Sequence, residues 1–343
     1  MHVGFIGGGG ITDTHMRAAR GVPGVQLAAI FGANREKTAS LAREHGVQAY
    51  DDVERFLQHR PMDMVAIGSP SGLHGEQGIA AARHQLHVLV EKPLEVTTAR
   101  ADELIAAADA AGVTLGVFFQ DRLRPAVRDM KRIVERGLLG SPVMISGRVK
   151  WYRPPEYYSG SRWRGTPALD GGGALINQAI HTLDLMLYLF GPVTRVYGAA
   201  ATRLHRIEVE DTLAAVLEFE SGALGTIEAG TSIYPGYQRR LEMTGSEGTL
   251  VLEHDRLAAV DLRSKPADLD RSTTRADTTA SASSPIVSDA SAHARVIEDF
   301  VSAIASGRRP ACDGREGRRS VEVVEAVYAS ARSHQAVVVG RKA

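Results

Sequence analysis

Residues 2–15 read HVGFIGGGGITDTH, an apolar run that passes through four glycines into a segment with helical spacing. The same succession of a short apolar run and an amphipathic stretch recurs through the first third of the chain. Strands that alternate with helices are joined by right-handed crossovers into a parallel sheet covered on both faces. We therefore predict a doubly wound α/β fold here. The apolar runs are HVGFIG (2–7), VQLAAIFG (25–32), DMVAIGSP (63–70), LHVLVEKP (86–93) and VTLGVFF (113–119), with helices near 11–21, 35–45, 73–84 and 97–111.

The pattern changes after about residue 120. A helical segment near 124–137 gives way to strand-like runs, and FESGALGTIEAG (219–230) predicts a hairpin turned at Ser221–Gly222. Successive strands with little helix between them indicate a largely antiparallel sheet, and therefore an α+β domain. A chain of 343 residues favours two domains, 1–120 and 121–343. The remaining predicted strands are 142–150, 193–203, 211–220, 223–231, 239–244 and 249–253, and the closing helices are 290–306 and 314–333.

The composition excludes several classes of protein. Forty basic residues balance forty acidic ones, so bulk charge gives no reason to expect a nucleic acid or an anionic membrane as partner. The single cysteine, Cys312, excludes an intrachain disulfide, and no metal site is expected. The N-terminus enters a strand at once, and the most apolar helix is too short to span a bilayer, so we expect a soluble, cytoplasmic protein. Residues 264–292, rich in Ser, Thr, Ala and Asp, are interpreted as a surface loop rather than a substrate lid or an oligomer arm.

The glycine-rich turn predicts a dinucleotide site. Gly7 and Gly9 permit a tight strand–helix turn that brings backbone N–H groups close to a pyrophosphate, although Thr12 stands at the third glycine position. The second strand ends at Gly32, where an acidic residue would hold the ribose of NAD. Arg35 follows and could meet the 2′-phosphate of NADP. The sequence leaves the choice between NAD and NADP open.

A lysine is placed at the end of the fifth strand by the sequence Glu91-Lys92-Pro93. Open parallel sheets bind ligands outside the carboxyl ends of their strands. Lys92 is therefore expected to face the nicotinamide. Without the neighbouring motifs, a lysine in a surface turn would be the default interpretation.

A second polar feature lies in GGGALINQAIHTLDLMLYLFG (171–191), an otherwise apolar helix. Asn177, His181 and Asp184 are spaced i, i+4 and i+7 and share one face, which Gln178 borders. Buried polar groups need partners. We interpret the face as the lining of an active site. Asp184 is assigned to a buried structural network, with orientation of His181 as the alternative.

The preceding segment, KWYRPPEYYSGSRWRGTPALDGGG (150–173), holds both tryptophans together with tyrosines and arginines. Aromatic faces suit sugar or base stacking, and guanidinium groups suit phosphate or carboxylate. The same residue types are also enriched at oligomer interfaces, and both interpretations stay open.

These motifs together resemble the Gfo/Idh/MocA oxidoreductases. The resemblance rests on GxGxI…H (7–15), SPSGLHGEQ (69–77), EKP (91–93) and GGGALINQAIHTLD (171–184). It implies a Rossmann domain, a second domain with a large open sheet, and a homo-oligomer, either a dimer or a tetramer. It also implies that Lys92 and His181 are catalytic. Many members carry aspartate where this chain has Asn177. The loop YRPPEYY…WRGTPALDGGGALINQ and the run FFQDRLRP (118–125) are most similar to the branch that oxidises the C3 hydroxyl of UDP-N-acetylglucosamine-type sugars.

The expected function is hydride transfer between the nicotinamide of NAD or NADP and a secondary alcohol of a sugar, nucleotide sugar or cyclic polyol. The alternatives are a catalytically silent NAD(P)-binding sensor or regulatory protein, and an aldehyde or imine reductase of the same family. The expected cofactor-binding residues are Gly7, Gly9, Gly10, Ile11, Thr12, Gly32, Asn34, Arg35, Ser69, Pro70, His74, Glu91 and Lys92. The expected substrate-binding residues are Gln120, Arg122, Tyr152, Arg153, Tyr158, Trp163, Arg164, Asn177, Gln178 and His181.

Overall fold

The computed structural model of the protein describes residues 1–264 and 290–340. The chain forms two compact units, one of Met1–Gln120 and Ile286–Arg318, the other of Asp121–Pro285 and Arg319–Ala343. The expected loop at 264–292 lies almost wholly outside the described residues.

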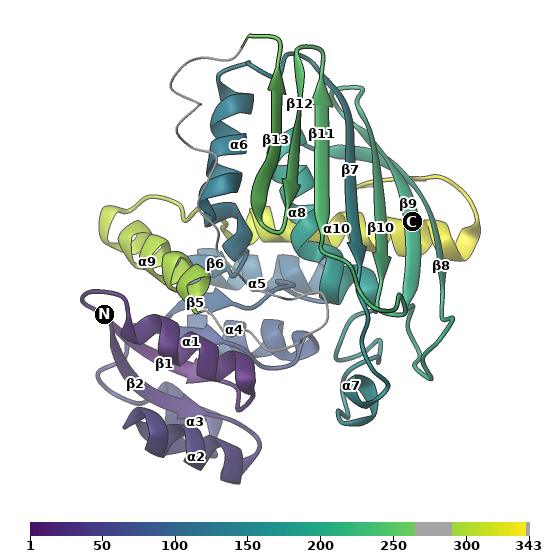
Figure 1. Cartoon of the computed structure of the whole chain (residues 1–343). Coiled ribbons are helices and arrows are strands. Elements are labelled where there is room, and N and C mark those ends of the chain that lie inside the picture. The colour runs from purple at the N-terminus through teal and green to yellow at the C-terminus, as the bar shows by residue number, and fades with distance from the viewer. Residues whose placement is uncertain (265–289, 341–343) are drawn as a thin grey trace. The chain divides into compact units, whose positions relative to one another are not determined.

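The structure differs from the predicted single domain boundary at residue 120, because a later segment of the chain returns to the first unit. Helix α9 (Ser291–Ser306) packs against α1 (Gly10–Arg20), and Figure 1 shows the two helices side by side. The N–H of Val117 also donates to the carbonyl of Cys312 at 3.0 Å. These contacts join segments far apart in sequence, which local patterns do not record.

The first unit is built on a parallel sheet. Among the described residues it has six strands in the order β3-β2-β1-β4-β5-β6. This arrangement confirms the predicted doubly wound α/β class. The strands are β1 (His2–Ile6), β2 (Gln26–Phe31), β3 (Gln48–Tyr50), β4 (Met64–Ile67), β5 (His87–Val90) and β6 (Leu115–Val117).

Helices cover both faces of this sheet. Val88 and Leu89 are consecutive in β5 and therefore point to opposite faces. A Cβ added at Gly78 of α4 would meet Leu104 of α5 and Val88, whereas one added at Gly116 would meet Phe300 of α9 and Leu89. The sheet is therefore buried between α4 with α5 and α1 with α9. The helices are α2 (Arg35–His45), α3 (Val53–Leu57), the 3₁₀ turn η1 (Ser71–Leu73), α4 (His74–Arg83) and α5 (Thr98–Ala111).

The second unit is built on a mostly antiparallel sheet. In the described part of the chain its strands run in the order β13-β12-β11-β7-β10-β9-β8-β14, and only the β7–β10 pair is parallel. The hairpin predicted at Ser221–Gly222 joins β9 to β10, and Gly222 has φ +84°. The strands are β7 (Pro142–Lys150), β8 (Val193–Ala201), β9 (Thr212–Phe219), β10 (Leu224–Gly230), β11 (Arg240–Gly245), β12 (Gly248–Glu253), β13 (Arg256–Leu262) and β14 (Val337–Val338).

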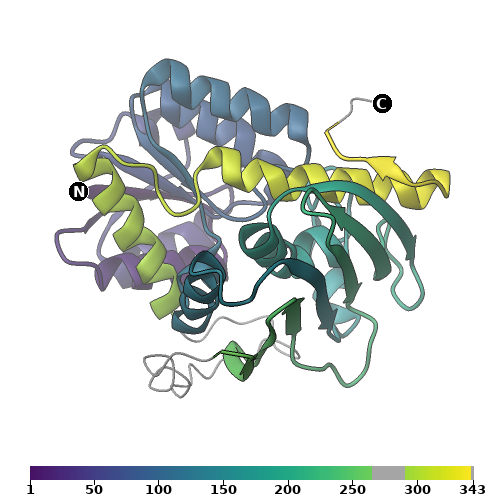
Figure 2. The ribbon, with the colours of Figure 1, turned by 90° about the horizontal axis from the view of Figure 1, so that it is seen from above.

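One face of this sheet is covered by helix. A Cβ at Gly147 of β7 would meet Thr182 and Met186 of α8 (Ile180–Phe190). The N–H of Gly198 in β8 donates to the Ser330 hydroxyl of α10 (Gly314–Ser333) at 3.0 Å, and Figure 2 shows this end of α10 running beside the sheet. The other helical elements are η2 (Gln120–Leu123), α6 (Pro125–Glu135) and α7 (Glu156–Ser159).

The predicted helix 174–190 is not one continuous α-helix. It begins as a π-helix, η3 (Ala174–Ala179), and continues as α8. The Glu210 carboxylate accepts the N–H groups of Gly173 and Leu175 at 2.9 Å each, so an external side chain caps this irregular turn. π-helical turns are rare and are often found at functional sites.

Candidate active site

The glycine-rich turn after β1 has the shape expected for a pyrophosphate. Gly7 has φ +133°, and a Cβ there would lie 2.8 Å from the Gly68 carbonyl oxygen. A Cβ on Gly9 or Gly10 would meet nothing within 4 Å. Gly9, the N-cap of α1, and Gly10 are exposed, so the helix N-terminus faces open space. Backbone N–H groups and the helix dipole at such an end favour an anion, and the turn therefore fits a dinucleotide.

Thr12 stands at the third glycine position, and its side chain does not block the glycine-rich turn. It is fully buried, and its hydroxyl has no hydrogen-bond partner among the described residues. Ile11, beside it, is only partly buried. The departure from the glycine fingerprint is therefore accommodated inside α1.

The packing at the end of β2 explains why glycine, and not an acidic residue, stands at position 32. A Cβ at Gly32 would lie 2.5 Å from the Thr38 hydroxyl and 3.1 Å from the Gly7 carbonyl oxygen, so no side chain fits there. Asn34 caps α2 by accepting the N–H of Lys37 at 3.0 Å. Arg35 is exposed and pairs with Asp51 at 2.5 Å, a partner that the sequence did not indicate.

The loop after β4 is fixed by its own contacts. The Ser69 hydroxyl donates to Gln77 at 2.6 Å, and Pro70 precedes η1. The buried imidazole of His74 lies 3.0 Å from the Ser69 carbonyl and 2.9 Å from the Pro93 carbonyl. Burial lowers the pKa of His74, against the effect of these carbonyls. The ring therefore lies between the β4 loop and the turn that carries Lys92, and in its neutral form it donates to one of the two carbonyls.

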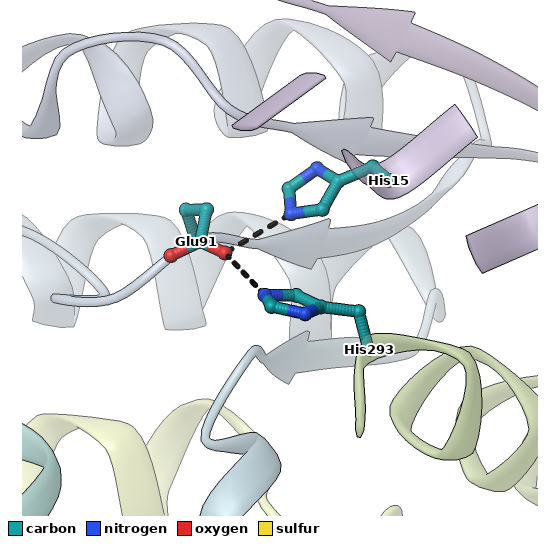
Figure 3. Close-up of side chains that lie close together, drawn as sticks. All are labelled: His15, Glu91 and His293. Atoms are coloured by element: carbon teal, nitrogen blue, oxygen red, sulfur yellow. Dashed lines mark hydrogen bonds and ion pairs between the residues drawn. The ribbon is translucent and has the colours of Figure 1, made fainter. Parts of the chain in front are cut away.

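Lys92 follows β5, two strands away from β1 in the sheet. The preceding side chain, Glu91, is buried and points back into the unit, where His15 of α1 and His293 of α9 face the same carboxylate oxygen (Figure 3). Its other oxygen accepts the N–H of Lys92 at 3.0 Å. Burial alone would raise the pKa of Glu91, but the two histidines hold it well below the usual range. Glu91 is therefore ionised, and its hydrogen bond with the Lys92 N–H holds the Lys92 peptide in place.

Gln120 follows β6 at the carboxyl edge of the same sheet. Its Oε1 is buried and has no hydrogen-bond partner in the described part of the chain. An unsatisfied buried acceptor is costly unless a ligand or water donates to it. The contact of Gln120 with a ligand therefore stays a prediction.

In the second unit, His181 faces Asp121. Its Nδ1 lies 3.8 Å from the Asp121 carboxylate, which also binds Arg239 and accepts from Arg124 Nε at 2.8 Å. Burial alone would raise the pKa of Asp121, but Arg239, Arg124 and His181 hold it well below its usual range. At 3.8 Å this contact is longer than a hydrogen bond, so Asp121 places a negative charge beside the imidazole.

Asp184 pairs with Arg122. Its carboxylate accepts two hydrogen bonds from Arg122, at 2.8 and 2.7 Å, and one from the Ser320 hydroxyl at 3.3 Å. Both members of the ion pair are almost completely buried. Asp184 therefore belongs to the structural network that we favoured for it. The expectation that Arg122 contacts substrate differs from this arrangement, because its guanidinium is committed to a buried pair.

The remaining polar groups of this helix also have partners. The Asn177 amide donates to Asp170, so a second carboxylate at position 177 would face like charge. The Gln178 amide donates to the Tyr157 hydroxyl at 3.0 Å, and its Oε1 accepts from Arg153 at 3.2 Å. Asn177 and His181 retain partial exposure. These two are the members of the polar face that are not fully buried, and their contact with substrate stays a prediction.

In the aromatic segment 150–173, the guanidinium groups of the arginines pack against the aromatic rings. Arg153 is buried over Trp151, and burial lowers its pKa. Arg164 stacks 4.2 Å above Tyr157 and 5.4 Å from Trp163. Of the other expected contacts, Tyr152 meets Tyr234 edge-on, and the buried Tyr158 hydroxyl pairs with Thr231 at 2.9 Å.

A cavity of about 730 Å³ adjoins this segment within the second unit. Arg162, Arg164 and Arg206 line it, together with the single acidic residue Glu208. The excess of guanidinium groups favours an anionic occupant. Arg206 comes from the loop between β8 and β9, which the sequence analysis did not connect with the site.

Comparison with known proteins decides the relationship. The profile of the oxidoreductase family with an NAD-binding Rossmann fold matches residues 1–119, and that of the Gfo/Idh/MocA C-terminal domain matches residues 127–251. The chain belongs to the Gfo/Idh/MocA oxidoreductase family. This membership confirms the predicted family, the NAD-binding type of the first domain and the oxidoreductase class. Among the described residues, no helix is long and apolar enough to cross a membrane.

Individual Gfo/Idh/MocA relatives are sugar and polyol dehydrogenases. D-Apiose dehydrogenase of Paraburkholderia graminis is 28% identical, over 97% of this chain and 88% of its own. Myo-inositol 2-dehydrogenase of Thermotoga maritima is 29% identical, over 78% and 80%. The WlbA dehydrogenase of Bordetella pertussis, solved with NADH and UDP-GlcNAcA, superposes with a TM-score of 0.91 at 29% identity, covering 100% of this chain and 98% of that one.

Proposed function

We propose that this protein is an NAD(P)-dependent dehydrogenase that oxidises, or in reverse forms, a secondary alcohol of a sugar or related polyol. The observation that carries the proposal is the anchored turn at Lys92, which follows β5 at the same sheet edge as the open glycine turn after β1. The sugar and polyol dehydrogenases among its relatives support the substrate class.

The proposed chemistry divides between two side chains. When bound, the nicotinamide accepts or supplies the hydride. We assign Lys92 Nζ to take up the hydroxyl proton during oxidation and to return it during reduction. We assign His181, whose Nδ1 faces Asp121, to hydrogen-bond the substrate. Positioned proton transfer of this kind contributes about 10²–10⁴-fold in rate.

Within this class, we propose a sugar that bears a phosphate or carboxylate, with a nucleotide sugar as the leading candidate. The cavity lined by Arg162, Arg164 and Arg206 supports an anionic group. The similarity to a WlbA dehydrogenase solved with UDP-GlcNAcA agrees with this choice.

The two alternative functions are not favoured. A catalytically silent sensor would not need the anchored lysine turn or the imidazole–carboxylate pair at His181 and Asp121. The named relatives are dehydrogenases of sugars and polyols rather than imine reductases.

We also propose a homo-oligomer built on the open face of the eight-stranded sheet. Tyr197 pairs with Val216 and Leu224 with Met144, and all four side chains are 45–51% exposed. Exposed apolar side chains on neighbouring strands in this way are typical of an interface. We expect Tyr197→Asp with Val216→Asp to shift the protein to monomers in light scattering; Arg256→Asp, on the edge strand β13, is the control. A monomeric wild-type protein would contradict the proposal.

We also place the protein in the cytoplasm, where NAD(P) is available.

The function is tested by a substrate panel. UDP-N-acetylglucosaminuronic acid, UDP-N-acetylglucosamine, myo-inositol, levoglucosan, D-xylose and D-apiose are each offered with NAD⁺ and NADP⁺, and nicotinamide absorbance is followed. We expect turnover of at least one member, highest among the anionic sugars. Tight NADH binding without turnover across the panel would instead support the sensor.

A further inference from the structure

The cluster of His15, Glu91 and His293 lies wholly within the first unit and has no part in the chemistry proposed above. The Nε2 atoms of His15 and His293 lie 3.0 and 3.6 Å from the same oxygen of Glu91 (Figure 3). All three side chains are almost completely buried. Three buried polar groups from α1, the end of β5 and α9 would be costly if they did nothing but fill space.

A metal ion is the first possibility for such a cluster, because the three ligand atoms lie within 4.8 Å of one another. A metal-bound imidazole carries its proton on the other nitrogen and almost always donates it to an acceptor. The Nδ1 atoms of both histidines are buried and have no hydrogen-bond partner among the described residues. The environment therefore lacks the acceptors that metal coordination requires.

The arrangement places the Nε2 atom of each histidine toward the same Glu91 oxygen. An ionised carboxylate only accepts, so His15 Nε2–H donates to it at 3.0 Å, and His293 Nε2 makes a longer contact with that oxygen at 3.6 Å. His15 is further held by stacking on Phe118, with ring centroids 4.1 Å apart and planes 10° apart. The second Glu91 oxygen accepts the N–H of Lys92. The carboxylate is thus held by donors from α1 and from the Lys92 peptide and by the longer contact with α9.

We propose that His15, Glu91 and His293 form a positioning clamp that sets the Lys92 turn against α1, the helix that begins at the glycine-rich turn. The proposal rests on the catalytic assignment of Lys92. The clamp residues act through Lys92 and do not touch substrate. Displacing a reacting group by about 1 Å can cost about 10²-fold in rate, so the clamp governs kcat more than cofactor affinity.

The most direct test of the clamp is the Glu91→Gln variant. A glutamine has one carbonyl and one NH₂ group, so it cannot accept from the histidines with one end and from Lys92 with the other. We expect kcat on the best panel substrate to fall about tenfold or more, with the NADH dissociation constant within about threefold of wild type. The control is Glu95→Gln, a buried carboxylate that accepts from Gly75 and Val96 and does not touch the clamp. It should retain kcat.

The histidines supply an independent pair of variants. His293→Phe keeps a ring without a donor, whereas His293→Gln restores an N–H at the position of Nε2. We expect His293→Phe to lower kcat about tenfold and His293→Gln to recover most of it. His293→Phe should add little to the loss in Glu91→Gln, because both break the same clamp. If Glu91→Gln does not fold, the comparison of His293→Phe with His293→Gln tests the clamp in its place.

Lysine titration gives a readout that needs no substrate. The chain has six lysines, so ¹³C-methylated lysines can be followed by NMR, with Lys92→Arg to assign the signal. We expect the Lys92 signal and its titration to change in Glu91→Gln and not in Glu95→Gln. Unchanged kcat and titration in the clamp variants, with Lys92→Ala inactive, would overturn the clamp alone. An active Lys92→Ala would instead overturn the proposed function. Stoichiometric zinc that His293→Phe loses would replace the clamp with a metal site.

Discussion

Arg122 and Asp184 form a buried ion pair in the second unit, joined by two hydrogen bonds of 2.8 and 2.7 Å. Asp184 lies three residues after His181 on the same helix, and its carboxylate accepts from Arg122 of η2. The pair holds α8 to η2. Asn177 and His181, in contrast, are partly exposed.

Removing Asp184 should therefore reduce stability. Asp184→Ala leaves the Arg122 guanidinium buried without its carboxylate, which typically costs about 3–5 kcal/mol. Chemical denaturation measures this loss. The control is Asp109→Ala, which breaks an exposed pair with Arg315 and should cost less than about 1 kcal/mol. Equal losses from the two variants would contradict the buried role.

Stability should also depend on pH through His74. Burial places the folded-state pKa of His74 below its value in the unfolded chain, about 6.5. The stability that the neutral ring contributes is therefore complete above pH ~6.5 and is lost as the pH falls toward the folded pKa. Burial also lowers the pKa of His15, which adds to the same slope.

His74→Gln keeps an N–H donor near the Ser69 and Pro93 carbonyls and removes the titrating group. Denaturation curves between pH 7 and 5 should show a shallower loss of unfolding free energy in this variant. The difference approaches one proton, or about 1.4 kcal/mol per pH unit. An unchanged slope would show that His74 does not contribute to the acid sensitivity.

Cofactor choice should be weak, because Gly32 leaves no side chain to reject a 2′-phosphate. We expect NADH and NADPH dissociation constants of similar size. Asp51→Ala releases Arg35 and should strengthen NADPH binding, whereas Arg35→Ala should weaken it. NADH binding should change little in both variants. A hundredfold preference for NADH, about 2.7 kcal/mol, would show that another feature governs the pocket.

The first sheet was largely predictable from the sequence, because parallel strands buried on both faces appear as continuous apolar runs. The three-residue strand β3 and the partly exposed edge strand β13 were too short or too polar to recognise. The π-helix was also missed, because it depends on Glu210, which lies more than thirty residues downstream of the amides it caps.

The sequence names candidate site residues but not their partners. Helical spacing could not reveal that Asp121 faces His181 while Arg122 pairs with Asp184. Likewise, the sequence indicated Lys92 but not His293, whose contact with Glu91 forms only when α9 returns to the first unit. Such pairings depend on tertiary structure rather than on spacing along the chain.

The central claim is that Lys92 transfers the hydroxyl proton, and single-turnover kinetics of Lys92→Ala test it most directly. The variant is saturated with cofactor and with the panel substrate of highest turnover, and the nicotinamide absorbance change is recorded. The account predicts a rate about 10²–10⁴-fold below that of wild type, with the NADH dissociation constant within about threefold. Full turnover by Lys92→Ala on that substrate would contradict it.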